Sequence, residues 1–150
     1  MAAPKGNKFW MERKEHGRKK TYETPQDLWE AFIDYALWVD ENPLQAAELV
    51  KFQGKYKVAN LPKMRAMTED EFVEHSLIGL STWALYCKAE GGHKDFMEVT
   101  TRIKTAIRNQ KFQGASADML NPNIIARDLG LADKKDHTVT TTEITVTDED

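Results

Sequence analysis

The sequence of 150 residues contains very little cysteine: Cys87 stands alone, so the chain can form no internal disulfide. A lone thiol of this kind is typical of proteins kept in the reducing cytosol. No uninterrupted apolar run comes near the roughly 18 residues that a membrane span needs. The first twenty residues are polar and basic and lack the apolar segment of a secretory signal. We therefore expect a cytoplasmic protein that does not associate with membranes.

Motifs of catalysis are missing as well. The phosphate-binding pattern GxxxxGK[ST] and the serine-nucleophile pattern GxSxG are both absent. Cys87 belongs to no CxxC pair, and the four histidines are scattered, with none four residues from another. Because no group of residues offers a nucleophile, a zinc site or a phosphate cradle, we expect no catalytic residue, no metal site and no cofactor.

Charge is distributed unevenly along the chain. The overall net charge of −3 conceals a segment, residues 1–20, whose seven bases and two acids give +5, and another, residues 133–150, with −4. A basic arm can bind a polyanion such as DNA by neutralising phosphates and releasing counterions. A solvated, disordered terminus has the same composition. The candidate DNA contacts in the arm are Lys5, Lys8, Arg13, Lys14, Arg18, Lys19 and Lys20.

Residues 24–132 have the pattern of a mainly helical core. Thr24-Pro25 is typical of a helix start, and Asn42-Pro43 of a helix end. Between them, apolar residues recur at helical spacing. Residues 49–58, which alternate in polarity about Gln53-Gly54, predict a small β-hairpin.

Two short helices are expected next, one reaching about Leu77 and one running from about Leu80 to Ala89. Thr68 and Glu71 have the spacing of a capping box at the start of the first. The pair has the outline of a helix-turn-helix, a DNA-binding unit, but two packed core helices explain the same residues. In the helix-turn-helix interpretation, the residues facing inward are Phe72, Val73, Ile78, Trp83 and Tyr86, and those facing outward are Thr82, Leu85 and Lys88.

The longest helix is expected after Asp95 and Glu98, which again have capping-box spacing, and its apolar face runs from Phe96 to Gln110. A last helix begins at Asn121-Pro122 and ends at Gly130. Bases accumulate on the long helix and form a second candidate DNA contact, with a solvated face or ion pairs between subunits as the alternative. They are Arg102, Lys104, Arg108 and Lys111.

Residues 137–147 are rich in threonine, valine and isoleucine, which favour a β-strand. An unpaired strand is an aggregation liability, so we expect it to pair with its copies in neighbouring subunits, in a sheet or barrel. The pairing would involve Val139, Ile144 and Val146; a disordered tail is the alternative. The expected organisation is a basic arm over 1–23, a helical core with oligomerisation surfaces over 24–132, and a linker, intersubunit strand and acidic tail over 133–150.

Three separated blocks carry a resemblance to a known family: MAAPKGNKFW at the start, PKMRAMT at 62–68, and QKFQGASADMLNPNIIARDLGL at 110–131. In this order they resemble the small terminase subunit of short-tailed, headful-packaging phages. The resemblance implies a nonamer-like ring of identical chains that binds viral double-stranded DNA at the packaging-initiation site. It also implies a non-catalytic protein that recruits the large terminase subunit and regulates its ATPase and nuclease activities. Such a protein acts in the host cytoplasm and is not expected in the mature virion.

The resemblance further implies a mainly helical fold with a small β element near the C-terminus that builds a barrel across subunits. Relatives of this kind carry a basic C-terminal extension, whereas this sequence ends in the acidic TVTDED. Either DNA binding falls to the arm and the helical bases, or the chain is shortened, and no tail residue is assigned to DNA. By elimination, the C-terminal end is expected to dock on the large subunit. The alternative function is a dimeric helix-turn-helix transcriptional regulator.

Overall fold

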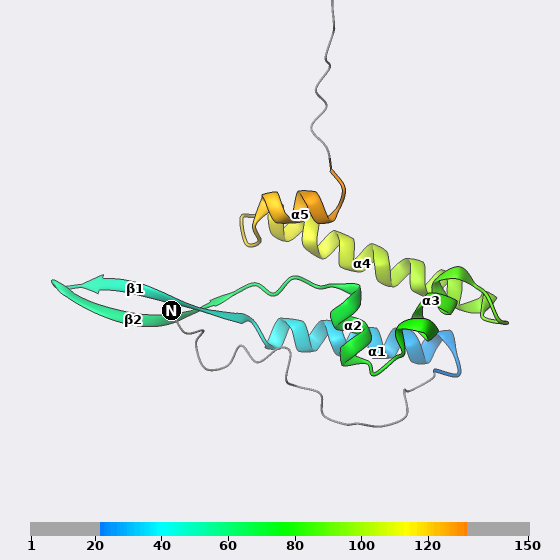
Figure 1. Cartoon of the computed structure of the whole chain (residues 1–150). Helices are drawn as coiled ribbons and strands as arrows, with labels where there is room; N and C mark the ends of the chain where they lie inside the picture. Colours follow the sequence, from blue (N-terminus) through cyan, green and yellow to red (C-terminus); the bar gives the residue numbers. More distant parts are fainter. Residues whose placement is uncertain (1–21, 132–150) are drawn as a thin grey trace, which may run out of the picture.

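The computed structural model describes residues 22–131, which form five α-helices, a short 3₁₀ helix and one antiparallel hairpin (Figure 1). The prediction of a mainly helical fold with a β-hairpin is confirmed. The basic arm and the expected strand with Val139, Ile144 and Val146 lie outside the described residues. In chain order the elements are α1 (Pro25–Glu41), β1 (Leu44–Phe52), β2 (Lys55–Lys63), α2 (Glu69–His75), α3 (Leu80–Lys88), η1 (Lys94–Phe96), α4 (Met97–Ser116) and α5 (Pro122–Asp128).

The core is built where α1, α2, α3 and α4 meet, and it is rich in aromatic rings. Phe72 of α2 lies at its centre, with its ring edge-on to Phe32 of α1 at 5.6 Å and to Trp83 of α3 at 5.4 Å. Such edge-to-face pairs add to the stabilisation from apolar burial. The helical spacing predicted for α1 is confirmed, since its buried residues are Leu28, Phe32, Tyr35 and Val39.

Most helix ends follow the sequence signals. Thr24 and Asp27 form a reciprocal capping box at the start of α1, Asn121 caps α5, and Gly130, with φ of 66°, follows the end of α5. The capping box expected at Asp95 and Glu98 is wrong. η1 leads directly into α4 there, and no side chain caps the first turn of α4.

The hairpin is longer than residues 49–58. β1 and β2 have nine residues each and are joined by a two-residue turn at Gln53 and Gly54, both with positive φ. Positive φ at both turn residues matches the right-handed twist of paired strands. The hairpin leaves the C-terminal end of α1 and projects away from the helices (Figure 1), so most of its side chains are exposed on both faces.

Arg65 joins the base of the hairpin to the core. Its Nη1 donates to Glu71 Oε1 at 2.9 Å, its Nε donates to the carbonyl of Asn42 at 2.7 Å, and its guanidinium lies 4.8 Å from the Trp38 ring centroid. The side chain of Arg65 is 10% exposed. One buried guanidinium therefore holds the end of α1, the start of α2 and the segment that leaves β2.

Tyr35 explains why the capping box predicted at Thr68 is only half formed. The Thr68 hydroxyl accepts from Glu71 N as expected, but the Glu71 carboxylate accepts from Tyr35 Oη at 2.8 Å and from Arg65 instead of reaching back. The Thr68 backbone N–H donates to Tyr35 Oη at 3.1 Å. Burial raises the pKa of the Tyr35 hydroxyl far above its ordinary value, so the hydroxyl keeps the proton that it donates.

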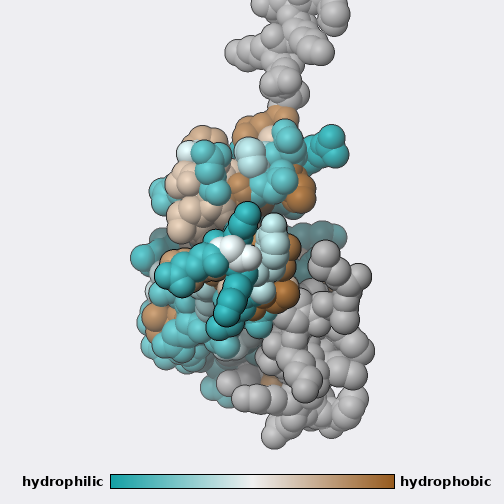
Figure 2. Space-filling view, turned by 90° about the vertical axis from the view of Figure 1, so that its left-hand side faces the viewer, coloured by the Kyte–Doolittle hydropathy of each residue, from teal (hydrophilic) through white to brown (hydrophobic). Residues whose placement is uncertain are grey.

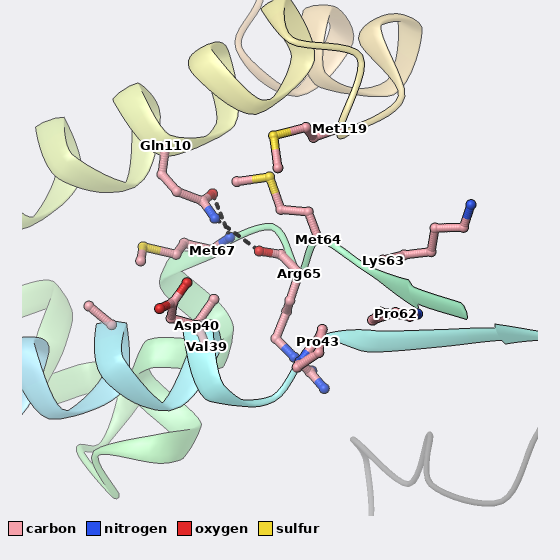
Figure 3. Close-up of a pocket in the computed structure, with 11 residues that line it drawn as sticks. Val39, Asp40, Pro43, Pro62, Lys63, Met64, Arg65, Met67, Gln110 and Met119 are labelled. Atoms are coloured by element: carbon pink, nitrogen blue, oxygen red, sulfur yellow. Dashed lines mark hydrogen bonds between the residues drawn. The ribbon is translucent and has the colours of Figure 1, made fainter. Parts of the chain in front are cut away.

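Gln110 of α4 fixes the same segment from the other side. Its Nε2 donates to the carbonyl of Arg65 at 2.9 Å and its Oε1 accepts from the N–H of Met67 at 3.0 Å (Figure 3). Beside it, a shallow pocket is bordered by the sulfur-bearing side chains of Met64 and Met119 (Figure 3). Gly114 lies at this junction, where a Cβ would meet Leu120 Cδ1 at 2.7 Å and Met64 Sδ at 2.9 Å. The absence of a side chain at 114 thus lets α4 approach both neighbours closely.

The Arg65→Ala substitution should lower the free energy of unfolding by roughly 2 kcal/mol, because it leaves the half-buried Glu71 carboxylate without its charged partner. Lys63→Ala is the control. It removes an ion pair of similar length, Lys63 Nζ to Glu48 Oε1 at 2.7 Å, whose side chains are about half exposed. That change should cost less than about 1 kcal/mol. Urea unfolding measures both, and equal losses would contradict the assignment of Arg65 as the joint.

Gly114→Ala should also destabilise the chain, by roughly 1–3 kcal/mol, because the added methyl overpacks against Leu120 and Met64. Helix propensity acts in the opposite direction and favours alanine by about 1 kcal/mol. Ser116→Ala, at an exposed position of the same helix, should be neutral or slightly stabilising. A gain in thermal stability for Gly114→Ala would show that the close approach is not tight.

Candidate nucleic-acid interface

The bases predicted on α4 do not form one patch. Successive residues of an α-helix are rotated by about 100°, so Arg102 and Lys104 lie on opposite sides of the buried Ile103. The guanidinium of Arg102 lies 4.0 Å from the ring centroid of Trp29 in α1. The ammonium of Lys104 lies 3.7 Å from Glu69 Oε2 of α2. Both side chains reach the surface, yet each also joins α4 to a different neighbouring helix.

Arg108 and Lys111 differ sharply in exposure. Arg108 is exposed and forms no ion pair within residues 22–131, which leaves its charge accessible to a phosphate. Lys111 is 9% exposed, and its Nζ lies 2.6 Å from Asp128 Oδ2 of α5. This placement gives Lys111 a structural role between α4 and α5 and does not support the predicted contact with DNA.

The helix-turn-helix interpretation of α2 and α3 predicts the packing correctly. Phe72, Val73, Ile78, Trp83 and Tyr86 are all buried. The turn passes through Leu77, which has φ of 58° in the left-handed region where glycine is common. The hydroxyl of Tyr22 donates to the Ser76 carbonyl at 3.1 Å, and that of Tyr86 donates to the Tyr22 carbonyl at 3.1 Å. These two hydrogen bonds tie the turn after α2, and α3 itself, to the segment that precedes α1.

The surface of this helix pair is unfavourable for DNA. α2 carries four acids, and Lys88 is the one base among the nine residues of α3. The exposed residues of α3 include Leu80 and Leu85, which are apolar. A helix that enters the major groove needs donors for bases and phosphates, and α3 offers few of them: the hydroxyls of Ser81 and Thr82 and the single base Lys88. The pair α2 and α3 therefore fits two packed core helices better than a DNA-binding helix-turn-helix.

No catalytic or metal-binding arrangement appears among residues 22–131. Burial raises the pKa of the Cys87 thiol, although the Lys104 ammonium acts in the opposite direction, so Cys87 lacks the depressed pKa of an activated nucleophile. The described part of the chain holds no group of three or more side chains able to bind a metal. None of its helices is long and apolar enough to cross a membrane.

The seven predicted contacts of the arm, from Lys5 to Lys20, lie outside the described residues. Two features of the described part were not predicted from sequence: the Arg65 joint, and the full length and exposure of the predicted hairpin. Arg65 lies in the block PKMRAMT between Met64 and Ala66, and a charge flanked by apolar residues is the local signal of a buried ion pair. The signal for the hairpin surface is LVKFQGKYKV, in which apolar residues occupy both phases of the strand alternation.

Comparison with known proteins matches residues 17–137 to the family described as DNA-packaging protein gp3. The chain is 46% identical over 134 residues to a protein of Salmonella phage P22 named "Terminase, small subunit". That similarity covers 89% of this chain and 80% of the relative. Both matches extend over the whole described core, including the hairpin and its Arg65 joint. The chain therefore belongs to the phage small terminase subunits, a family of non-catalytic DNA-packaging proteins.

Proposed function

We propose that this small terminase subunit acts as a ring of identical chains that binds viral double-stranded DNA at the packaging-initiation site. In this role it recruits the large terminase subunit and regulates its ATPase and nuclease activities. The observation that carries the proposal is the 46% identity with the P22 small subunit over 89% of the chain. By elimination, the C-terminal end is the proposed docking segment for the large subunit.

The balance of charge supports the arm as the main DNA contact. Residues 22–131 contain twelve bases and sixteen acids, a net charge of −4, whereas residues 1–20 carry +5. A core of this charge repels DNA at long range, so the arm must supply most of the attraction. The exposed bases Arg102, Lys104 and Arg108 are secondary contacts in this scheme.

Reversing the charge of Arg18, Lys19 and Lys20 to glutamate should weaken DNA binding at least about tenfold at ~0.1 M salt. It should also lower the slope of log affinity against log salt by about 3, since each phosphate contact contributes ~0.9. Fluorescence anisotropy over a salt series measures both quantities. The matched control reverses three exposed bases of the core, Lys88, Lys94 and Arg127, to glutamate. An unchanged affinity and slope in the arm variant would exclude the arm as the main contact.

Removing the residues after Lys135 should reduce the mass of the assembly, because the proposed strand with Val139, Ile144 and Val146 would lose its partners in neighbouring copies. Native mass spectrometry of the full and shortened chains reports this directly. The full chain should have the mass of a ring of many copies. A two-fold dimer would instead support the alternative function, a helix-turn-helix transcriptional regulator. A shortened chain that keeps the full mass would show that the strand does not hold the ring.

A further inference from the structure

The hairpin exposes large apolar side chains that its own chain leaves in water. Leu49, Phe52, Tyr56 and Val58 are 67%, 72%, 66% and 64% exposed. Leu49 lies directly opposite Val58 in the strand register, and Lys51 lies opposite Tyr56, so Leu49, Tyr56 and Val58 share one face, whereas Phe52, opposite Lys55, lies on the other. Because the hairpin points away from the helices (Figure 1), none of the described elements covers this face. Exposed apolar groups clustered in this way indicate a binding surface.

Lysines surround the apolar residues of the hairpin. Lys51 shares the face of Leu49, Tyr56 and Val58, with its ammonium 5.6 Å from the Tyr56 ring centroid, whereas Lys55 and Lys57 lie near the turn on the opposite face. Lys63, at the base, is already paired with Glu48. Figure 2, which views the molecule from the side to which the hairpin projects, shows hydrophilic and hydrophobic residues next to each other on that side of the molecule. The surface is therefore apolar at its centre and positive at its edge.

The outer face of α1 has the complementary pattern. Ile33 and Leu37 are 40% and 57% exposed and lie on the side of α1 opposite its buried residues. The acids Glu30, Asp34 and Glu41 follow the same stripe at intervals of one helical turn or two. α1 contains five acids and no base, and within residues 22–131 none of these acids forms an ion pair. This surface is therefore apolar at its centre and negative at its edge.

We propose that the hairpin of each copy packs on the outer face of α1 of the next copy, with Leu49, Tyr56 and Val58 against Ile33 and Leu37. Lys51, which lies on the same face of the hairpin, then pairs with an acid of the stripe, Glu30 or Asp34. This interface joins two different surfaces of the same chain, which is the head-to-tail contact that a closed ring requires. The inference rests on the ring of the proposed function and identifies the surfaces that form it.

The described geometry favours a second copy of the chain over DNA as the partner that covers the apolar face of the hairpin. An apolar face set against phosphates would stay in contact with water, whereas α1 of another copy buries it and supplies a carboxylate for Lys51. The hairpin cannot deliver its tip to its own α1, because it leaves the end of that helix and extends for nine residues, or about 30 Å. Its direction is fixed at the base by Arg65, so the tip is held out toward a neighbour.

Cross-linking between copies tests the contact directly. In the full chain with Cys87→Ser, the pair Leu37→Cys and Val58→Cys should yield a ladder of covalent oligomers with a short bismaleimide. Each single cysteine variant should yield no ladder, because one position does not face itself across a head-to-tail interface. A wild-type ring by native mass spectrometry, together with no ladder in the double variant, would overturn the hairpin contact and leave the ring. A wild-type monomer would overturn the ring itself.

Charge exchange provides a second test that does not depend on cross-linker geometry. Lys51→Glu, or Glu30→Lys with Asp34→Lys, should each raise the concentration needed for assembly at least about tenfold. The three changes combined in one chain should restore assembly, because the reversed charges attract again. Lys57→Glu, which makes the same charge change on the opposite face of the hairpin, should assemble as the wild type does. Failure of the combined variant to recover would overturn the contact, as would a hairpin variant that keeps the ring but loses DNA affinity.

Discussion

The ion pair between Arg65 and Glu71 is the constraint on which the architecture of this subunit depends. The Arg65 guanidinium is nearly enclosed, so its charge requires a carboxylate, a carbonyl and an aromatic face arranged around it, and α2, the end of α1 and Trp38 supply them. Satisfying one buried charge thereby fixes where the chain re-enters the core after β2. Gln110 fixes the same segment from α4 through two backbone hydrogen bonds. The direction of the hairpin follows from these contacts.

A hairpin anchored at its base keeps a fixed direction relative to the helices, which a loosely attached hairpin would not. An isolated two-stranded hairpin is marginally stable in water, and this one has little of its own core. Anchoring its base lowers the conformational entropy that assembly would otherwise have to remove. In the proposed ring, α1 of the neighbouring copy supplies the missing apolar partner. The folded subunit is then complete only in the assembly, as is common where a protomer carries exposed apolar groups.

Local sequence signals predicted the helices and the hairpin well. They predicted less well which residues distant in the sequence contact one another. The helix starts at Thr24 and Asn121, the turn at Gln53-Gly54 and the apolar stripe of α1 are decided by residues close in sequence, and they are confirmed. Glu71 departs from its capping box because distant groups, Tyr35 and Arg65, compete for its carboxylate. Lys111 was assigned to DNA by residue type alone. Asp128 lies on the predicted last helix, but sequence spacing does not show that this helix packs against α4, where its carboxylate pairs with the nearly buried Lys111.

The distribution of charge predicts two kinds of association, with DNA and between copies, and the two differ in how they depend on salt. The arm sequence is positive and the core has a net negative charge, so the proposed DNA attraction depends on counterion release and weakens steeply with salt. The proposed contact between the hairpin and α1 has an apolar centre, which salt does not screen, and ion pairs at its edge that contribute little to affinity but fix the register. The acidic stripe of α1 that would attract a neighbouring hairpin also repels DNA. The same acids therefore favour binding of a neighbouring hairpin to α1 and disfavour binding of DNA there, so that DNA binds at the arm.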